Sequence, residues 1–198
     1  MVPFDLPTGA GVENRRHRVL LTTADDRAND GSSMTDTSFV PDPANHRPLR
    51  EALGRFATGV CVVTTMTPDG PMGFTANSFA SLSLDPALVL WSPAKSALRY
   101  AVFAGARHFA IHVLRADQQD MMHRFVRRGA GFGGLAQEVT TEGIPVIPGT
   151  LARFDCAQAA THDGGDHLIV VGRVLRAATG PGEPLVFSAG RYGGFAAG

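Results

Sequence analysis

Two short polar segments have the residue types of a site for a planar ligand that carries phosphate. The first covers residues 75–83 (TANSFASLS) and the second covers residues 92–96 (SPAKS). Small hydroxyl and amide side chains can hydrogen bond to the edge of a heteroaromatic ring. The Lys95 ammonium, the Ser96 hydroxyl and a possible helix start beside them are suited to a phosphate. Taken alone, such clusters are more often ordinary polar turns, so their chemistry stays open at this point.

A third polar segment, residues 162–167 (HDGGDH), places two histidines and two aspartates around a pair of glycines. A closed zinc site usually draws its ligands from more than one element, whereas these four side chains would share the tip of one hairpin. We therefore expect no metal here. The segment is either a polar turn, or it presents His167 to a ligand at the start of a strand.

Two other patterns are rejected as sites. Residues 129–134 (GAGFGG) fit the spacing GxGxxG, but a helical pattern precedes them. A dinucleotide fingerprint must follow a strand and open a helix, so we expect a loop after a helix instead. Cys61 and Cys156 have no activating neighbour, and we expect both thiols to pack as small apolar side chains on strands.

Charge and cysteine content exclude several classes of protein. The 198 residues carry 18 basic and 18 acidic side chains, and Lys95 is the one lysine. This balance lacks the basic excess of nucleic-acid-binding proteins. No apolar run approaches the ~20 residues that a membrane span needs. Two cysteines without CxxC spacing, and no signal-peptide pattern, lead us to expect a reduced, cytoplasmic protein.

The elements that must position these residues lie in the second part of the chain. Residues 1–46 lack sustained periodicity and are rich in Pro, Gly, Asp, Asn, Ser and Thr, which predicts a flexible leader. Met34 offers a second plausible start within that leader. Residues 47–198 form the predicted domain, which has enough apolar content to build its own core.

Strand-like segments outnumber helical ones in this domain. Helices are expected from Pro48 to Gly59, from Ser96 to Ala104 and after Asp117, with Ser96 and Asp117 as caps. Strands are expected at residues 60–66, 73–76, 87–91, 108–114, 151–160, 167–177 and 185–187, with residues 162–165 as the turn between the two longest. Sequential, turn-linked strands without a repeated βαβ unit predict a mostly β fold, a small antiparallel barrel with peripheral helices.

The order of these segments resembles the flavin reductase domain family, which has an FMN-binding split-barrel fold. The similar segments are residues 55–65 (RFATGVCVVTT), 73–79 (GFTANSF), 83–86 (SLDP), 95–96 (KS) and 165–167 (GDH). Several motifs in one order make the resemblance more specific than any single piece. It covers about residues 48–195 and implies an antiparallel Greek-key split β-barrel.

The resemblance also implies an activity. Members of this family are homodimers that use NADH or NADPH to reduce free FAD or FMN, typically for a separate flavin-dependent monooxygenase. The implied reaction moves a hydride from nicotinamide C4 to flavin N5, so the cofactors carry the difficult step and the protein orients them. On this resemblance we expect FAD and NADH ahead of FMN and NADPH.

Site residues follow from the same resemblance. The expected flavin and nicotinamide contacts are Thr75, Ala76, Asn77, Ser78, Ser81, Ser83, Lys95, Ser96, Asp166, His167, Arg191 and Tyr192. Within this set Lys95 and Ser96 would hold phosphate. His167 would be the catalytic residue, placed beside the nicotinamide.

The end of the chain departs from the family, and two other functions stay open. The family ends in Gly-x-Tyr-Arg, but here Gly193 follows Tyr192, so Arg191 is the candidate substitute for the missing arginine. The first alternative is a non-catalytic flavin- or haem-binding module, which would need no nicotinamide-facing histidine. The second is an oxidase of a phosphorylated vitamin on the same barrel, which would need a basic cluster that a chain with one lysine does not obviously offer.

Overall fold

The computed structural model describes residues 37–126, 131–135 and 138–195. The chain divides into two units, Met1–Val40 and Pro41–Gly198. Of the first unit, residues 37–40 are described and form no helix or strand. Residues 1–36, which make up most of the expected leader and include Met34, lie outside the described residues. At the end of the expected leader, Asp42 and Asn45 close a short turn.

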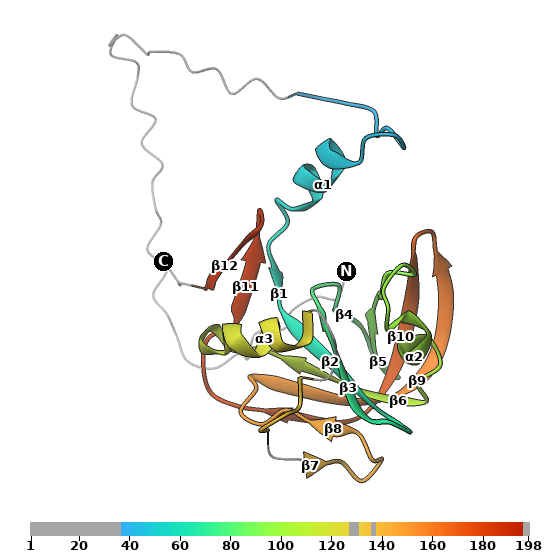
Figure 1. Cartoon of the computed structure of the whole chain (residues 1–198), viewed down its shortest axis with the longest axis vertical. Coiled ribbons are helices and arrows are strands. Elements are labelled where there is room, and N and C mark those ends of the chain that lie inside the picture. Colours follow the sequence, from blue (N-terminus) through green and yellow to red (C-terminus); the bar gives the residue numbers. More distant parts are fainter. Residues whose placement is uncertain (1–36, 127–130, 136–137, 196–198) are drawn as a thin grey trace, which may run out of the picture. The chain divides into compact units, whose positions relative to one another are not determined.

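The second unit is built mainly from antiparallel strands. Its elements are α1 (Arg47–Leu53), β1 (Thr58–Gly59), β2 (Cys61–Thr67), β3 (Gly70–Ala76), β4 (Ala80–Leu84), β5 (Ala87–Trp91), α2 (Tyr100–Ala104), β6 (His108–Val113), a 3₁₀ turn (Ala116–Gln118), α3 (Gln119–Val126), β7 (Glu138–Val139), β8 (Pro145–Val146), β9 (Ala152–Gly164), β10 (His167–Thr179), β11 (Leu185–Ser188) and β12 (Arg191–Gly194). The main sheet has the order β3-β2-β6-β9-β10-β5-β4, and a smaller sheet has the order β1-β11-β12. The expectation of a mostly β, antiparallel fold is confirmed (Figure 1).

The main sheet curves until its two ends meet through side chains. Phe74 belongs to the edge strand β3 and Trp91 to β5, near the opposite edge, yet their ring centroids lie 5.7 Å apart. Phe103 of α2 packs edge-on against both rings. Trp91 and Phe103 are almost completely buried. The aromatic cluster therefore fills the interior of a barrel.

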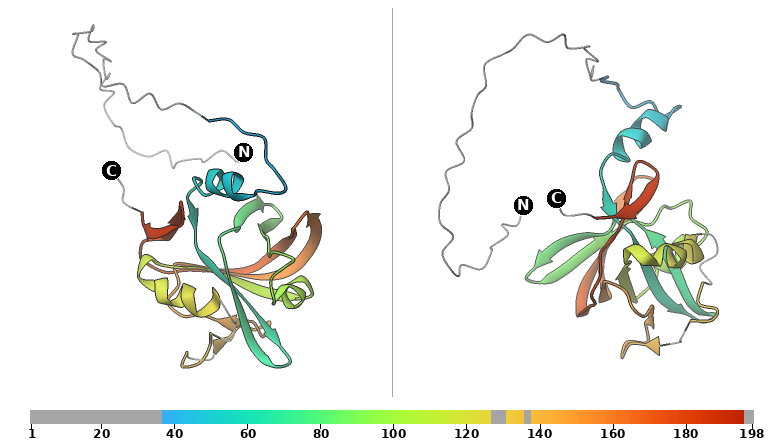
Figure 2. Two further views of the ribbon diagram at one scale, coloured as in Figure 1. Left: turned by 45° about the horizontal axis from the view of Figure 1, so that its top comes forward. Right: turned by 90° about the vertical axis from the view of Figure 1, so that its left-hand side faces the viewer.

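Strand β2 faces two cores at once because successive side chains of a strand point to opposite faces. Cys61 and Val63 pack in the barrel interior. Val60, just before β2, and Val62 pack in a second cluster that includes Phe125 of α3. Figure 2 shows α3 lying along the outside of β2 and β3, in line with its contacts. The continuous run of β-branched residues in this strand is the sequence signal of burial on both faces.

Close contact between α3 and β3 depends on a glycine. A Cβ atom added to Gly73 would lie 2.3 Å from the Phe125 ring, a separation that real Cβ atoms do not show. The absence of a side chain at Gly73 thus lets α3 lie directly against the strand that leads into the first polar segment.

Helix boundaries differ from the sequence expectation. Helix α1 ends at Leu53 rather than near Gly59, because the Gly54 N–H already closes the last turn on the Arg50 carbonyl. Helix α2 begins at Tyr100 with no side-chain cap, so Ser96 does not cap it. In the turn ahead of α3 the N-cap position is Arg115, whose N–H donates to the Gln118 side-chain oxygen over 3.1 Å, so Asp117 is not the cap.

The long hairpin and the chain end also differ in detail. Strands β9 and β10 pair from end to end, with His167 opposite Gly164, so the connection is shorter than the expected turn at residues 162–165. Gly165, at φ +76°, supplies the left-handed conformation that a two-residue loop requires. Sequence reasoning missed β4 and β12, and also the two-residue strands β1, β7 and β8. Among the described residues, no helix is long and apolar enough to span a membrane.

Candidate functional site

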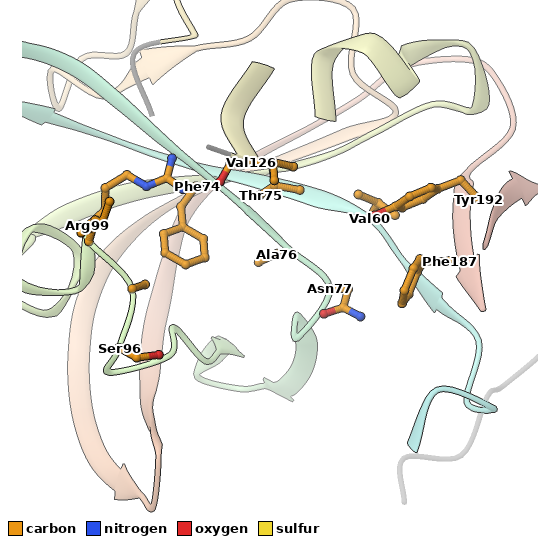
Figure 3. A pocket seen from close by; sticks show the side chains of 12 residues that line it. Val60, Phe74, Thr75, Ala76, Asn77, Ser96, Arg99, Val126, Phe187 and Tyr192 are labelled. Atoms are coloured by element: carbon orange, nitrogen blue, oxygen red, sulfur yellow. Dashed lines mark hydrogen bonds between the residues drawn. The ribbon is translucent and has the colours of Figure 1, made fainter. Parts of the chain in front are cut away.

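A pocket of about 510 Å³ lies where the end of β3, the segment before α2 and the small sheet converge. Its lining residues are Val60, Phe74, Thr75, Ala76, Asn77, Ser96, Ala97, Leu98, Arg99, Val126, Phe187 and Tyr192. Figure 3 shows Phe74, Arg99 and Ser96 on one side and Phe187 and Tyr192 on the other, with Ala76 and Asn77 between them. The pocket thus combines aromatic walls with hydroxyl and amide groups.

Ser78 joins the two polar segments that the sequence singled out. Its hydroxyl donates to the Ser92 carbonyl over 3.1 Å and accepts from the Ser92 N–H over 2.9 Å. The Ser78 side chain is half-buried, and its hydroxyl makes both hydrogen bonds to the backbone of Ser92. Residues 75–78 and residues 92–96, which are separated along the chain, are therefore held at a fixed distance from each other.

Thr75 and Arg99 fix the wall that α3 contributes. The Thr75 hydroxyl donates to the Met122 carbonyl over 2.9 Å. The Arg99 guanidinium donates to the carbonyls of Phe125 and Val126 at the end of α3, and to a third carbonyl on β3, at 2.8–2.9 Å. Partial burial lowers the pKa of Arg99. Thr75 keeps its oxygen lone pairs available toward the pocket, because its hydrogen bond to α3 uses only the hydroxyl proton.

The guanidinium of Arg99 also lies over an aromatic wall of the pocket. Its central carbon is 4.9 Å from the centroid of the Phe74 ring. A cation over the face of a ring is attracted by the ring quadrupole. Arg99 therefore sets the orientation of Phe74 as well as the position of α3.

The facing wall comes from the small sheet. The rings of Phe187 on β11 and Tyr192 on β12 have centroids 4.9 Å apart, and the two residues pair across the sheet. His123 of α3 meets Tyr192 edge-on at 6.4 Å. Asn77 and Phe187 also line a neighbouring pocket of about 690 Å³ beside α1, so the two hollows share one boundary.

The tip of the β9–β10 hairpin lies against the second polar segment. The Lys95 N–H donates to the Asp166 carbonyl over 2.8 Å, and the Leu168 N–H donates to the Pro93 carbonyl over 3.1 Å. Lys95 Nζ lies 2.8 Å from Asp163 Oδ2. These contacts place the GDH motif next to residues 92–96.

His167 is oriented by its neighbour in the same motif. Its Nδ1 lies 2.7 Å from Asp166 Oδ1, and the imidazole is 43% exposed. The hydrogen bond from His167 lowers the pKa of the Asp166 carboxyl. The other ring nitrogen, Nε2, is thus the one left for a ligand.

The predicted site residues fall into three groups. Those that line the pocket are Thr75, Ala76, Asn77, Ser96 and Tyr192. Those that hold neighbouring segments without lining it are Ser78, Lys95, Asp166 and His167. Those that do neither are Ser81 and Ser83, on β4, and the exposed Arg191, on β12. The structure therefore gathers most, but not all, of the set around one hollow.

Sequence reasoning missed Phe74, Arg99 and Phe187 as site residues. Phe74 belonged to a recognised motif, so its position next to Thr75 was the available signal. Arg99 fell inside the helix expected from Ser96 to Ala104 and was not singled out from the sequence. Its carbonyl partners at residues 73, 125 and 126 are too distant in sequence to be anticipated.

The patterns set aside at the sequence level behave as structural parts. Cys61 and Cys156 are buried, and burial raises the pKa of both thiols to about 12, so neither supplies a thiolate. Of the GxGxxG segment, residues 129–130 lie outside the described residues, and residues 131–134 form a turn after α3. No group of three or more metal-ligating side chains occurs within the described part of the chain.

Comparison with known proteins identifies relatives along most of the domain. Residues 53–196 match the family described as flavin reductase like domain. FMN reductase (NADH) SmoA of Agrobacterium fabrum is 61% identical, with 79% of this chain and 90% of that protein covered. Reductase subunit HsaB of a flavin-dependent monooxygenase from Mycobacterium tuberculosis is 40% identical, with 75% of this chain and 81% of that protein covered.

A solved structure supports the same relationship at the level of the fold. The NADH:FAD oxidoreductase SgcE6 of Streptomyces globisporus, in complex with NAD and FAD fragments, has a TM-score of 0.74 and 37% identity to this chain. The match covers 80% of this chain and 98% of that one. The split-barrel expectation is confirmed by this likeness.

Proposed function

The chain belongs to the flavin reductase like domain family, and we propose that it is an NAD(P)H-dependent flavin reductase that supplies reduced flavin to a separate flavin-dependent monooxygenase. The observation that carries this proposal is the pocket. Aromatic side chains flank hydroxyl, amide and backbone groups there, and this donor set fits a planar heteroaromatic ring with polar atoms along one edge.

Residues around the pocket offer two kinds of contact to such a ring. Phe74 and Phe187 offer apolar surface, while Thr75, Asn77 and Ser96 offer hydrogen-bonding groups. A bound flavin supplies a ring that accepts a hydride. The chain's own contribution is to bind the ring, orient it and keep it between these walls.

His167 is the residue we assign to the nicotinamide side. Asp166 fixes the orientation of its imidazole over 2.7 Å, and backbone hydrogen bonds fix the turn against residues 93–95. A histidine held in this way can orient a bound co-substrate without acting as a nucleophile. No strong general base is required, because the cofactors perform the chemical step.

Both flavins belong in the assay. SmoA is named for FMN and NADH, whereas SgcE6 is named for FAD and NADH. The reductase proposal predicts that the purified protein oxidises NADH or NADPH once FMN or FAD is added. The loss of absorbance of the reduced nicotinamide measures this oxidation. If no combination gives oxidation, the alternative function is favoured, a non-catalytic flavin- or haem-binding module.

His167→Ala sharpens this test. We expect kcat/KM for NADH to fall about ten-fold, because a lost positioning contact of about 1.4 kcal/mol corresponds to that factor. The dissociation constant for flavin should stay within about two-fold of the unsubstituted protein. Loss of flavin affinity with unchanged nicotinamide kinetics would show that His167 serves the flavin instead.

The family resemblance further proposes a homodimer, and the structure offers a reason. Helix α1 buries none of its residues, although a helix this short is unstable without packing. Leu53 on this helix and Phe56 just after it are 67% and 77% exposed. A second copy would cover this apolar surface, and light scattering on the purified protein tests it.

Location and domain limits complete the proposal. We assign residues 47–198 to the reductase domain and residues 1–46 to a leader outside it. Two buried, unpaired cysteines within the described part of the chain fit a reducing compartment, which favours the cytoplasm. Deletion of residues 1–46 should leave NADH oxidation unchanged if this division is right.

A further inference from the structure

The single lysine of this chain is held by a carboxylate. Lys95 Nζ donates to Asp163 Oδ2 over 2.8 Å, with the two side chains 34% and 78% exposed. The hydrogen bond from Lys95, with help from the Gly165 N–H, lowers the pKa of the Asp163 carboxyl. Asp163 is therefore ionised and paired at neutral pH.

Backbone contacts make this pairing a built feature of the fold. The Lys95 N–H donates to the Asp166 carbonyl over 2.8 Å, and Ala94 bridges to His167. Both partners of the ion pair thus sit on segments whose main chains are bonded to each other. Asp163 is in addition fixed by the Gly165 N–H, which donates to its Oδ1 over 2.9 Å.

The pairing removes net positive charge from the second polar segment, next to the pocket residue Ser96. Lys95 contributes one positive charge, and Asp163 and Asp166 each contribute a negative one. Arg99, which does line the pocket, already donates to three carbonyls. An incoming phosphate therefore meets a lysine whose charge is already balanced.

We propose that Asp163 competes with the flavin phosphate for the Lys95 ammonium and thereby keeps phosphorylated flavins exchangeable. This inference rests on the proposed function, in which Lys95 is the phosphate-binding lysine. An ammonium has three donors, so Asp163 does not exclude the phosphate, but it lowers the electrostatic gain of binding it. A reductase whose reduced flavin must reach a separate protein needs such a moderate hold.

The test compares FMN with riboflavin, which has the same ring and no phosphate. Trp91, the only tryptophan, lies 5.7 Å from the pocket residue Phe74, so quenching of its fluorescence reports flavin binding. Asp163→Asn keeps the Oδ1 acceptor for Gly165 and removes the charge. We expect the dissociation constant for FMN to fall about five-fold at low salt, with the gain shrinking at high salt, and that for riboflavin to stay unchanged.

Two further variants separate competition from other effects. Asp69→Asn removes an equal charge from the exposed β2–β3 turn and should leave both dissociation constants unchanged. In a Lys95→Met background, Asp163→Asn should give much less than a five-fold gain. The same gain in that background would mean repulsion of the phosphate by Asp163 alone, and would overturn the competition.

The outcomes also keep this inference apart from the proposed function. Weaker FMN binding in Asp163→Asn would mean that the carboxylate orients Lys95, and equal changes for FMN and riboflavin would mean a structural effect on the hairpin. No change would mean that the ion pair has no influence. Each of these overturns the inference while NADH oxidation by the unsubstituted protein still supports a reductase. Absence of that oxidation would instead overturn the proposed function.

Discussion

Two polar clusters of this protein use similar side chains in opposite ways. The buried polar cluster consists of Thr64, Thr65, His112 and Asp155, each no more than 4% exposed. The pocket cluster consists of residues 75–78 and 92–96 with the tip of the β9–β10 hairpin, and its polar side chains are half-buried or exposed. The buried polar cluster lies within strands β2, β6 and β9 of the main sheet, whereas the pocket cluster lies at and beyond strand ends of the same sheet.

The difference lies in where the hydrogen bonds go. Thr64 donates to the Pro145 carbonyl over 2.6 Å, and Thr65 donates to the His108 carbonyl over 2.9 Å. His112 bonds on both ring nitrogens, to Val62 O and to the Ile147 N–H. A buried polar group without a partner is costly, so these residues are committed to the fold.

The pocket cluster keeps unused hydrogen-bonding capacity. Asn77 and Ser96 line the pocket and have no side-chain hydrogen bond to another described residue within the pocket wall. Water can satisfy them, so they cost little when no ligand is present. Polar residues with unused hydrogen-bonding groups at a pocket are suited to binding a ligand, whereas buried polar residues whose partners belong to the protein itself hold the barrel together.

Among substitutions in the buried polar cluster, we expect that of Asp155 to lower the free energy of unfolding most. Arg153 Nε lies 2.9 Å from Asp155 Oδ1, and Arg176 Nε lies 3.9 Å from Oδ2. Asp155→Ala removes the buried carboxylate that these two partly exposed guanidinium groups face, and we expect a loss of about 2–3 kcal/mol in the free energy of unfolding. Urea denaturation measures it.

A surface ion pair provides the matched control for Asp155. Arg47 and Glu51 pair at i,i+4 over 2.8 Å, with both side chains more than half exposed. Exposed pairs contribute little, so Glu51→Ala should leave the free energy of unfolding nearly unchanged. Equal losses for the two variants would contradict the distinction between a buried and an exposed carboxylate.

The pH dependence of stability comes next in size. Burial lowers the pKa of His112 to about 3, well below the 6.5 of an imidazole in water. Below pH 6.5 the unfolded chain binds a proton that the native imidazole does not, so stability decreases as the pH falls. The slope is at most about 1.4 kcal/mol per pH unit, which gives a loss of about 2 kcal/mol between pH 6.5 and pH 5.

Geometry explains why the native imidazole stays neutral. Nε2 accepts from the Ile147 N–H over 3.1 Å, and a proton on that nitrogen would face another proton. His112→Gln can keep one of the two hydrogen bonds but cannot titrate. We expect this variant to be less stable at neutral pH and to lose the slope between pH 6.5 and pH 5; an unchanged slope would assign it to other groups.

Strands and turns near both clusters could be predicted from the sequence, whereas the long-range contacts of their side chains could not. Apolar runs located β2 and β5, and the turn expected at residues 162–165 located the β9–β10 hairpin, because these signals are contained within a few residues. Strand β4 was missed because the serines of its sequence, ASLSL, were interpreted as part of a polar segment. Alternation with exposed leucines was the overlooked signal.

Long-range pairing limited the prediction of the site. Lys95 was correctly singled out as unusual, but its partner Asp163 is 68 residues away, and nothing in the local pattern links them. Arg99 likewise bonds to carbonyls about 26 residues away on either side. Such contacts arise from the curvature of the sheet, which single-sequence patterns do not specify.

Ser78 offers the smallest and most specific test, because it lies in the pocket cluster yet has saturated hydrogen bonds like the buried one. Ser78→Ala removes both bonds to Ser92, and we expect a loss of about 1 kcal/mol in the free energy of unfolding. Since the two polar segments then lose their link, riboflavin and FMN should both bind more weakly, as measured by Trp91 quenching.

A hydroxyl outside the pocket serves as the control for Ser78. Thr141, exposed in the turn between β7 and β8, lies away from the residues that line the pocket, and Thr141→Ala should change neither stability nor flavin binding. If Ser78→Ala lowers stability but leaves both flavin dissociation constants unchanged, Ser78 belongs functionally to the buried polar cluster. Weaker flavin binding at nearly unchanged stability would instead assign Ser78 to the pocket cluster. Its role would then be to hold the two polar segments in the positions that bind the ligand.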